Sequence, residues 1–393
     1  MLSNDLPGRA ELIRRASELV PTLRKFSTWN EENRRVHDDA VAALAEAGIF
    51  RMRTPLRYGG YECDTRTLVD VAAELARGDG STAWAASVYW IPTWMASHFP
   101  DYVQDTVFAG PDSLVCGTLS PSAMATPIEG GIAVNGKWGF ITGALHSRWQ
   151  AIIAVLVAPE AEPMPVIALV PTSDLQIVDD WHTAGLRGTG SVSTVAQDLF
   201  VPQDRFLPLG AVLEGEGVSH ANKSSGIYQA PLLPVASASS VGVALGLAKA
   251  ALDAFTQRLG DRKITYTNYT SQREAPITHL QLGDAAIRVD EAQFHAHRLA
   301  ALVDRKAAEQ APWTIDERVL ARADMGATVQ RAREAVETLA NASGGSSIYL
   351  DVPIQRILRD IQALSLHALM HPNTNSELYG RLLSGLEPNT LYV

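Results

Sequence analysis

The hydrophobic periodicity of the chain changes twice along its length, and this pattern constrains the fold most strongly. From Ala10 to about Phe108, apolar residues recur at three- and four-residue spacing, which is typical of amphipathic helices. From about Ser113 to Leu207, short apolar runs rich in β-branched residues are separated by turn signals. Helical periodicity then returns and continues to about Leu383. This order predicts an α+β fold with a helical, a β and a second helical unit.

The boundaries between these patterns define three predicted domains. We expect an N-terminal helical domain over residues 1–112, a middle antiparallel β domain over 113–215 and a C-terminal four-helix bundle over 216–393. The β domain is expected to be a sandwich or barrel, with strands near Gly131–Val134, Ala151–Val157, Val166–Val170 and Thr194–Phe200. The bundle helices are expected over Val235–Leu259, Ile277–Lys306, Ile315–Asn341 and Pro353–Leu383.

Composition and charge exclude several classes of protein. Apolar residues make up 46% of the 393 residues and charged residues 19%, which is typical of a globular chain. The formal net charge of −10 argues against nucleic acid or an anionic membrane surface as a general partner. Cys63 and Cys116 are too few for a disulfide framework or a Cys-rich metal site. We therefore predict no metal and a reducing, cytoplasmic compartment.

No segment is a strong candidate for export or for crossing a membrane. The N-terminus carries charges where a secretory signal needs an apolar core. The longest uninterrupted apolar run, Ala151–Ala158, is far shorter than the ~20 residues of a spanning helix. The longer stretch Pro234–Phe255 contains Lys249 and Asp253, and its small residues suit close helix packing in a protein interior. We therefore predict no membrane partner.

The motifs of the common nucleotide-binding folds are absent from the sequence. No GxGxxG follows a predicted strand, and GxxxxGK[ST] does not occur. A cofactor that contains a nucleotide would therefore be held in another way than in Rossmann or P-loop proteins.

Landmarks in the β unit and the bundle resemble the acyl-CoA dehydrogenase fold. Phe140–Gly143 follows Val134–Lys137, where that fold places a Trp-Ile-Thr segment against the flavin. Gly185–Ser191 is similar to its second β landmark, and Gly344-Gly345 followed by Gln355–Asp360 is similar to its C-terminal landmark. The helical, β, helical order agrees as well, so the resemblance covers nearly the whole chain.

Departures from the dehydrogenase pattern argue against dehydrogenase chemistry. Acyl-CoA dehydrogenases remove an α proton with a glutamate, commonly about eight residues after the Arg-Asp pair on the last bundle helix. Here Asp360 is followed by Ile361–Ala368, which contains no carboxylate. The Thr-Glu-Pro and Gly-Ser-Asp segments on the flavin side are also missing, and Thr118–Ser122 stands in their place.

The sequence instead resembles the oxygen-using branch of this fold, the group D two-component flavin-dependent monooxygenases. That branch carries a Trp-x-Phe-x-Ser/Thr-Gly-x-x-His-x-x-Trp run, then Arg-Asp followed seven residues later by His, and Glu-Leu-Tyr-Gly-Arg. The matching residues are Trp138, Phe140, Thr142, Gly143, His146, Trp149, Arg359, Asp360, His367 and Glu377–Arg381. Gly78–Trp84 is also similar to the pattern of the branch.

The resemblance implies a reaction and a set of partners. Such an oxygenase component receives reduced FMN or FAD from a separate flavin reductase and adds O2 at the flavin C4a carbon. It uses the C4a-hydroperoxide to hydroxylate a small molecule, and it must keep that group dry. A Trp-rich helix beside the flavin suits an apolar aromatic or polyketide-like substrate, so Trp84, Trp90 and Trp94 are substrate-binding candidates, with core packing as the alternative. The implied assembly is a homotetramer.

Two residues are the main catalytic candidates. The resemblance places Thr142, through its hydroxyl or its backbone, near flavin N5, where a hydrogen bond would stabilise the oxygen adduct. It places His367 on the helix that faces the flavin, where an imidazole that works near neutral pH would deprotonate or orient the substrate. A lone His or Thr is more often structural, and the matched motifs favour the functional roles here.

Further candidates are expected around the cofactor. Besides Thr142 they are Gly143, His146, Arg187, Ser191, Gly344 and Gly345. A guanidinium and a hydroxyl suit a flavin phosphate, although Arg187 and Ser191 also fit a simple turn. The glycine pair fits either a helix-to-helix turn or a close backbone approach to a flavin that lies between subunits. For His146 a structural hydrogen bond is an equal alternative.

Three other functions stay open. The same chemistry with a nitrogen nucleophile would make the chain an N-hydroxylase of amines or amino sugars. An acyl-CoA dehydrogenase requires a carboxylate elsewhere as the base, and a non-catalytic flavin-binding or scaffold protein is the simplest alternative. The motifs at Thr142 and His367 argue against the scaffold, and the missing glutamate argues against the dehydrogenase.

Overall fold

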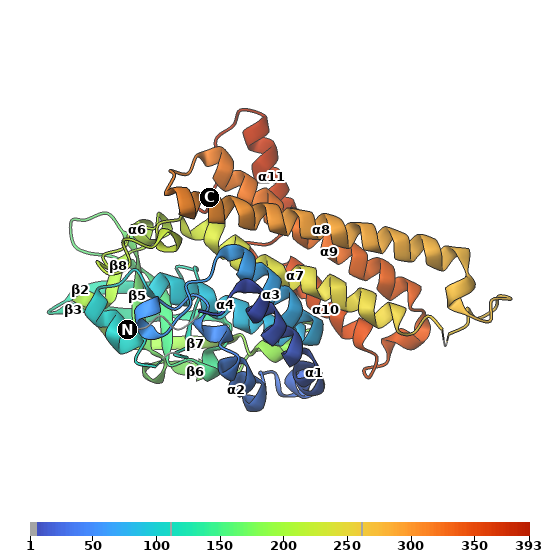
Figure 1. Ribbon diagram of the computed structural model, residues 1–393. Coiled ribbons are helices and arrows are strands. Elements are labelled where there is room, and N and C mark those ends of the chain that lie inside the picture. Colours follow the sequence, from blue (N-terminus) through green and yellow to red (C-terminus); the bar gives the residue numbers. More distant parts are fainter. Residues whose placement is uncertain (1–5, 111, 261) are drawn as a thin grey trace.

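The computed structural model describes residues 6–110, 112–260 and 262–393. Helices form the N-terminal part, strands follow in the middle of the chain, and long helices form the C-terminal part (Figure 1). This order confirms the α+β arrangement that the periodicity predicts. The N-terminal helices are α1 (Arg9–Asn33), α2 (Asp38–Glu46), α3 (Thr65–Gly78), α4 (Gly80–Ala96) and α5 (Asp101–Val107).

The strands of the middle part belong to one eight-stranded sheet. They are β1 (Val115–Gly117), β2 (Ala123–Ile128), β3 (Gly131–Ile141), β4 (Trp149–Leu156), β5 (Met164–Pro171), β6 (Gln176–Val178), β7 (Val192–Pro202) and β8 (Phe206–Pro208). Seven follow the order β6-β7-β3-β2-β4-β5-β8, and β1 pairs with β4. The sheet is mainly antiparallel as expected, but β1 and β2 run parallel to β4. β5 also contacts β7, although three strands lie between them in this order, so the sheet curls toward a barrel.

The C-terminal part is a bundle built around one apolar helix. Its helices are α6 (Leu209–Leu213), α7 (Leu232–Thr256), α8 (Pro276–Glu309), α9 (Ile315–Ala342), α10 (Pro353–Ser365) and α11 (Pro372–Leu383). α7, α8 and α9 lie side by side in Figure 1, α10 packs on α7 and α9, and α11 packs on α9. α7 is long and apolar enough to cross a membrane, but 89% of its most apolar window is buried inside the protein. It is the core helix of the bundle.

The fourth predicted bundle helix, over 353–383, is wrong because the structure divides it into α10 and α11. Residues 366–371 form turns between the two helices. Pro372 is the first residue of α11, and His371 before it has extended backbone angles (φ −58°, ψ 119°). A proline disfavours the helical conformation in the residue that precedes it, so the helix cannot continue through this point.

The N-terminal helices and the bundle share one core. α7 packs against α3 through glycines, since a Cβ at Gly246 would lie 2.2 Å from the Ala73 carbonyl oxygen. A Cβ at Gly242 would lie 2.3 Å from the Val69 carbonyl oxygen. The small residues of α7 therefore allow two helix backbones to approach closely, as the sequence suggests.

Asp79 sets the direction of α4, the helix that carries much of the site. Its extended backbone (φ −157°, ψ 122°) ends α3, and its carboxylate accepts a hydrogen bond from the Thr82 backbone N–H to begin α4. α4 then packs on α3, on α7 and on β1. The helix is therefore placed where the N-terminal part, the sheet and the bundle meet.

Candidate active site

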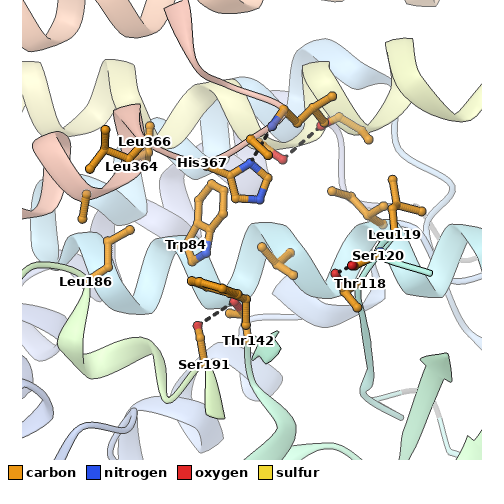
Figure 2. A pocket seen from close by; sticks show the side chains of 18 of the residues that line it. Trp84, Thr118, Leu119, Ser120, Thr142, Leu186, Ser191, Leu364, Leu366 and His367 are labelled. Carbon is orange, nitrogen blue, oxygen red and sulfur yellow. Dashed lines mark hydrogen bonds between the residues drawn. The ribbon is translucent and has the colours of Figure 1, made fainter. Parts of the chain in front are cut away.

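A large cavity lies at this meeting point (Figure 2). Its volume is about 1220 Å³, which exceeds the range of about 300–1,000 Å³ for a pocket that holds one drug-sized ligand. The walls come from α4, the end of β3, α7 and the segments 117–121, 181–191 and 359–369. The space is large enough for a cofactor and a substrate side by side.

Three hydroxyl groups form a chain of hydrogen bonds on the sheet side of the cavity. Thr142 Oγ1 and Thr189 Oγ1 each lie 2.7 Å from Ser191 Oγ, and Thr189 donates to the Leu186 carbonyl oxygen at 2.9 Å. Thr189 has one hydroxyl proton and uses it on Leu186, so Ser191 donates to Thr189 and Thr142 donates to Ser191. The Thr142 oxygen is therefore left as a hydrogen-bond acceptor for a ligand in the cavity.

The backbone N–H of Thr142 is already occupied. It donates to the Phe140 carbonyl oxygen at 2.9 Å, in a tight turn at the end of β3 where Phe140 has a φ of 61°. Gly143 follows with a φ of 76°, and a Cβ there would lie 2.3 Å from the Tyr89 hydroxyl oxygen. Of the two groups that the sequence leaves open for Thr142, the hydroxyl is the one available to a ligand.

His367 lines the same cavity, but it does not lie on a helix. It is the second residue after α10, in the turns that precede α11. Its ring makes an edge-on contact with Trp84, with 5.2 Å between ring centroids (Figure 2). The prediction that His367 lies on the last bundle helix is therefore wrong, although the side chain still points into the site.

The surroundings of His367 keep its ring neutral. The side chain is exposed to the cavity, and the surrounding protein atoms displace enough water from the ring to lower its pKa to about 4. The Leu369 backbone N–H donates to Nδ1 at 3.3 Å, so the neutral ring carries its proton on Nε2. An Nε2–H group donates a hydrogen bond and does not remove a proton. The geometry favours orienting a substrate oxygen over deprotonating it.

A buried carboxyl holds the segment 183–187 in the cavity wall. Asp360 Oδ1 accepts a hydrogen bond from the Leu186 backbone N–H at 2.6 Å. Burial, and then the neighbouring Asp79, raise the pKa of Asp360 to about 7. Gly185 allows the close approach to α10, because a Cβ there would lie 2.0 Å from the Arg359 carbonyl oxygen. α10 thus fixes the position of Leu186, the acceptor that ends the hydroxyl chain.

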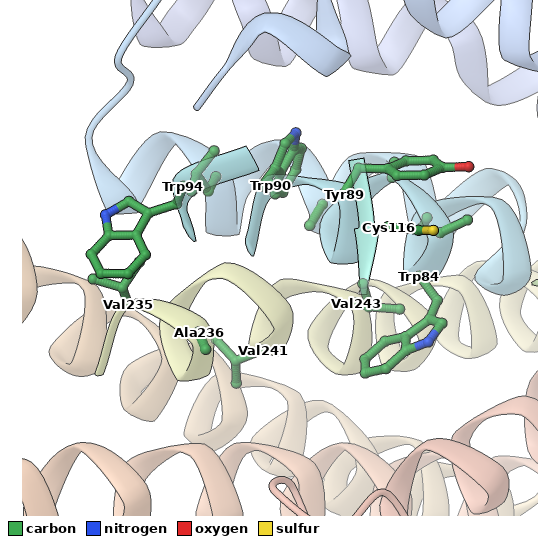
Figure 3. Close-up of a cluster of buried hydrophobic side chains, with 14 of the residues drawn as sticks. Trp84, Tyr89, Trp90, Trp94, Cys116, Val235, Ala236, Val241 and Val243 are labelled. Atoms are coloured by element: carbon green, nitrogen blue, oxygen red, sulfur yellow. The ribbon is translucent and has the colours of Figure 1, made fainter. Parts of the chain in front are cut away.

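Of the three tryptophans predicted to bind substrate, only Trp84 lines the cavity. Trp90 and Trp94 are buried in the core, where their indole N–H groups donate to the carbonyl oxygens of Ile49 at 2.8 Å and Ile227 at 2.6 Å. In Figure 3, Trp90 points away from α7 and Trp94 lies beside Val235. Helical geometry explains why only Trp84 reaches the cavity.

At 3.6 residues per turn, the α4 residues that share a face with Trp84 are Val88, Ile91 and Met95, and all three line the cavity. Trp90 and Trp94 are spaced six and ten residues from Trp84, which places them on other faces. Trp90 and Trp94 therefore pack in the core, which is the alternative that the sequence leaves open for them.

Three of the predicted cofactor residues lie outside the cavity lining, and two of them, His146 and Gly143, have structural partners. His146 Nε2 lies 3.0 Å from the Val36 carbonyl oxygen, which is the structural alternative raised for it. The Gly143 carbonyl oxygen accepts a hydrogen bond from Tyr89 at 2.9 Å. Arg187 opens a short 3-10 helix (Arg187–Thr189), and its buried Nε has no hydrogen-bond partner among the described residues. Ser191, in contrast, lines the cavity beside Thr142.

Gly344 and Gly345 lie far along the chain at the end of α9, also outside the cavity lining. Gly344 has a φ of 67°, a conformation that favours glycine, and it precedes a 3-10 helix (Gly345–Ile348). Within one chain, the pair makes the helix-to-helix turn that the sequence gives as one alternative.

Comparison with known proteins identifies the fold. Residues 15–100 match the family described as acyl-CoA dehydrogenase, N-terminal domain, and residues 238–372 match acyl-CoA dehydrogenase, C-terminal domain. The structure is also similar to that of XiaF from Streptomyces sp. in complex with FADH2 and glycerol. That similarity has a TM-score of 0.90 at 29% sequence identity and covers 97% of each chain. The fold and the cavity thus define a protein of the acyl-CoA dehydrogenase fold.

Two curated relatives identify the branch. A pigment production hydroxylase of Rhodococcus sp. (strain ATCC 21145) is 32% identical and covers 95% of this chain and 96% of its own. The oxygenase component of an FADH2-dependent resorcinol hydroxylase of Rhizobium sp. (strain MTP-10005) is 31% identical and covers 97% and 96%. The chain belongs to the oxygenase components of the two-component flavin-dependent monooxygenases.

Membership in this family supports the main functional prediction over its alternatives. The chain is a flavin-dependent monooxygenase that uses reduced flavin, and as an oxygenase component it depends on a separate flavin reductase. The dehydrogenase and the scaffold are not supported by these relatives.

Sequence reasoning missed several residues that build the site. It quoted Thr189 and Asp360 only as landmarks of motifs, and it did not single out Arg322 of α9, which also lines the cavity. Asp79 was also not singled out, although the sequence does mark it locally. An Asp directly before Gly-Ser-Thr is typical of a helix N-cap. The roles of the others arise from contacts between residues that are far apart in the chain.

Proposed function

We propose that the chain hydroxylates an apolar aromatic or polyketide-like small molecule, with reduced FAD as its flavin. One observation carries the proposal, namely a single cavity with the free acceptor of Thr142 on its sheet side and the Nε2–H donor of His367 in its wall. The first group suits a reduced cofactor and the second suits an oxygen-bearing substrate.

The groups on the sheet side fit a reduced flavin. A reduced flavin carries a proton on N5, and the Thr142 oxygen is the matching acceptor. Phe140 and Trp181, with ring centroids 5.7 Å apart, supply aromatic surface beside it. When bound, reduced flavin supplies the electrons that activate O2. The choice of FAD over FMN is supported by the resorcinol hydroxylase and XiaF, both of which are described with FADH2.

The walls near His367 fit an apolar ring. Trp84, Val88, Ile91 and Met95 of α4 face Leu233 and Ala236 of α7 across this space. His367 is the polar group beside Trp84, so a substrate hydroxyl or carbonyl oxygen that accepts from Nε2–H would be oriented for reaction. The apolar side chains of this wall also offer water few hydrogen-bond partners, which limits the loss of activated oxygen.

Oxygen-isotope labelling tests this proposal. The chain, FAD, NADH and a flavin reductase are incubated under 18O2 with resorcinol, 2-naphthol and 6-hydroxy-2-naphthoate, and the products are analysed by mass spectrometry. We expect one 18O atom in the product of at least one phenol, and less product with His367→Ala at unchanged O2 uptake. Complete conversion of O2 to H2O2 with every phenol would contradict the aromatic substrate class.

We also propose a cytoplasmic homotetramer. The outer face of α8 exposes Ile277, Leu280, Ile287 and Phe294, which are 56–75% exposed, and the segment 348–350 adds Ile348, Tyr349 and Leu350. Exposed apolar side chains at this density mark a surface that another chain covers. The family resemblance implies that a second copy of this chain covers the surface.

Gly344 and Gly345 adjoin segment 348–350, so they stay candidates for a cofactor contact across a subunit interface. The cytoplasm as location is supported by the low cysteine content.

A further inference from the structure

Arg322 is a buried cation in the wall of the active-site cavity. Its side chain extends from α9 and is only 6% exposed. Nε donates to the Asn375 side-chain oxygen at 2.8 Å, and Nη1 donates to the Tyr392 carbonyl oxygen. Both acceptors are neutral, so they fix the plane of the guanidinium without balancing its charge.

The other charged groups of the cavity wall have partners of opposite charge. Arg359 pairs with Glu31, and Glu377 lies 3.9 Å from Arg381. Arg322 is in none of the ion pairs among the described residues. Burial lowers the pKa of Arg322 to about 10, which leaves it protonated at neutral pH. The cavity therefore contains one uncompensated positive charge.

The guanidinium also has unused donors. Two of its five N–H groups are taken by Asn375 and Tyr392, and Nη2 has no acceptor among the residues that the structure describes. A buried charge without a partner of opposite charge costs stability. Its presence in a cavity wall therefore points to a ligand that supplies the missing anion.

The hydrogen bonds of Asn375 connect Arg322 to the His367 side of the cavity. Asn375 accepts from Arg322 and donates to the Leu369 carbonyl oxygen at 2.9 Å, and the Leu369 N–H donates to His367 Nδ1. The turn after α10 thus fixes both side chains. A ligand that contacts His367 has the free N–H groups of Arg322 along the same wall.

We propose that Arg322 binds a carboxylate on the substrate, so that the preferred substrates are aromatic acids whose ring oxygen faces His367. This inference rests on the proposed function and narrows its substrate class. The planar guanidinium presents two parallel N–H groups, the arrangement that matches the two oxygens of a carboxylate. A phosphate of the flavin is the other anion that could reach this charge.

Matched ligands test the inference by binding rather than by turnover. The chain is saturated with reduced FAD under anaerobic conditions and titrated with 6-hydroxy-2-naphthoate or with its neutral amide, 6-hydroxy-2-naphthamide. We expect the acid to bind at least about tenfold more tightly than the amide. Arg322→Met should bring the two dissociation constants to within about twofold, and Arg322→Lys should keep part of the preference.

Two further measurements separate the inference from its alternatives. Arg322→Met should leave the dissociation constant of reduced FAD unchanged, and any loss in melting temperature should be no larger than the loss of two hydrogen bonds, to Asn375 and Tyr392, explains. Weaker FAD binding with an unchanged acid preference would assign Arg322 to the flavin phosphate, and a lower melting temperature with equal losses for both ligands would make it structural. Equal binding of acid and amide by the parent would overturn the inference even where 18O2 labelling supports the proposed function.

Discussion

At the scale of single residues, hydrogen-bond partners decide what Thr142 and His367 can do. The chain from Thr142 through Ser191 and Thr189 to the Leu186 carbonyl fixes the direction of every hydroxyl proton. The Leu369 N–H likewise fixes the tautomer of His367. Thr142 is thereby an acceptor and His367 a donor, which neither residue type guarantees by itself.

Replacing Thr142 by valine should uncouple oxygen use from hydroxylation. Valine has nearly the same shape and lacks the acceptor oxygen, so the cofactor loses one hydrogen bond while the fold is kept. We expect the ratio of H2O2 released to product formed to rise roughly three- to tenfold, the equivalent of one hydrogen bond. Thr142→Ser is the matched control and should stay close to the parent. An unchanged ratio in Thr142→Val would remove Thr142 from the cofactor site.

The acidity of His367 can be measured directly. Because desolvation lowers its pKa from 6.5 to about 4, NMR of histidine-labelled protein should show that the His367 imidazole stays neutral down to about pH 4, as should that of His98, whose pKa burial lowers to about 3. The His367→Asn variant identifies the His367 signal by its absence. A midpoint near 6.5 would show that the ring is solvated.

The same shift has a consequence for stability. Between pH 6.5 and about 4 the unfolded chain binds a proton at this residue and the folded chain does not, so stability falls as the pH is lowered through this range. Denaturation of His367→Asn should show a smaller decrease from pH 7 to pH 5 than denaturation of the parent does.

At the scale of secondary-structure elements, the sequence predicts the long elements and misses contacts between them. β3, β4, β5 and β7 and the helices α7, α8 and α9 carry strong periodicity, and all were predicted. The short strands β1, β6 and β8 have three residues each, too few for a period to be recognised. Pro372 was a visible signal for the end of a helix, and the long helix predicted over 353–383 ignored it.

The same limit applies to the candidate site. Thr142, Ser191, His367 and Trp84 were found because they lie in motifs or in an unusual cluster. Arg322 was not, because α9 alone does not reveal that one of its arginines faces a cavity formed by distant parts of the chain. Trp90 and Trp94 were assigned to the substrate because the three tryptophans were treated as one unit, although Trp84 lies on a different face of the helix from the other two.

The faces of α4 predict different effects for two tryptophans. Trp94→Ala removes a fully buried ring and should lower the free energy of unfolding by about 3–5 kcal/mol. Trp84→Ala opens a wall that already borders a cavity, so we expect a smaller stability loss and weaker binding of aromatic ligands. Chemical denaturation and ligand titration of both variants check this. Equal stability losses with no change in binding for Trp84→Ala would place Trp84 in the core as well.

At the scale of the whole molecule, the main prediction is that the chain forms a homotetramer. If α8 lies in an interface, light scattering should give about four times the 42.4 kDa mass of one chain. Leu280→Glu and Phe294→Glu put charges into that surface and should yield smaller species. Tyr102→Glu, at an exposed aromatic residue away from α8, is the control and should leave the mass unchanged. A parent protein that remains monomeric at high concentration would contradict the tetramer.

The glycine contacts between α3 and α7 limit how this chain can exchange parts with its relatives. The two helices are far apart in the sequence, and their backbones approach so closely that a single methyl group at Gly242 or Gly246 would collide with the partner helix. A chimera that takes residues 65–78 from one parent and 232–256 from another would combine two mismatched surfaces. Crossover points that keep both helices from the same parent avoid this mismatch, so recombination is best confined to the sheet.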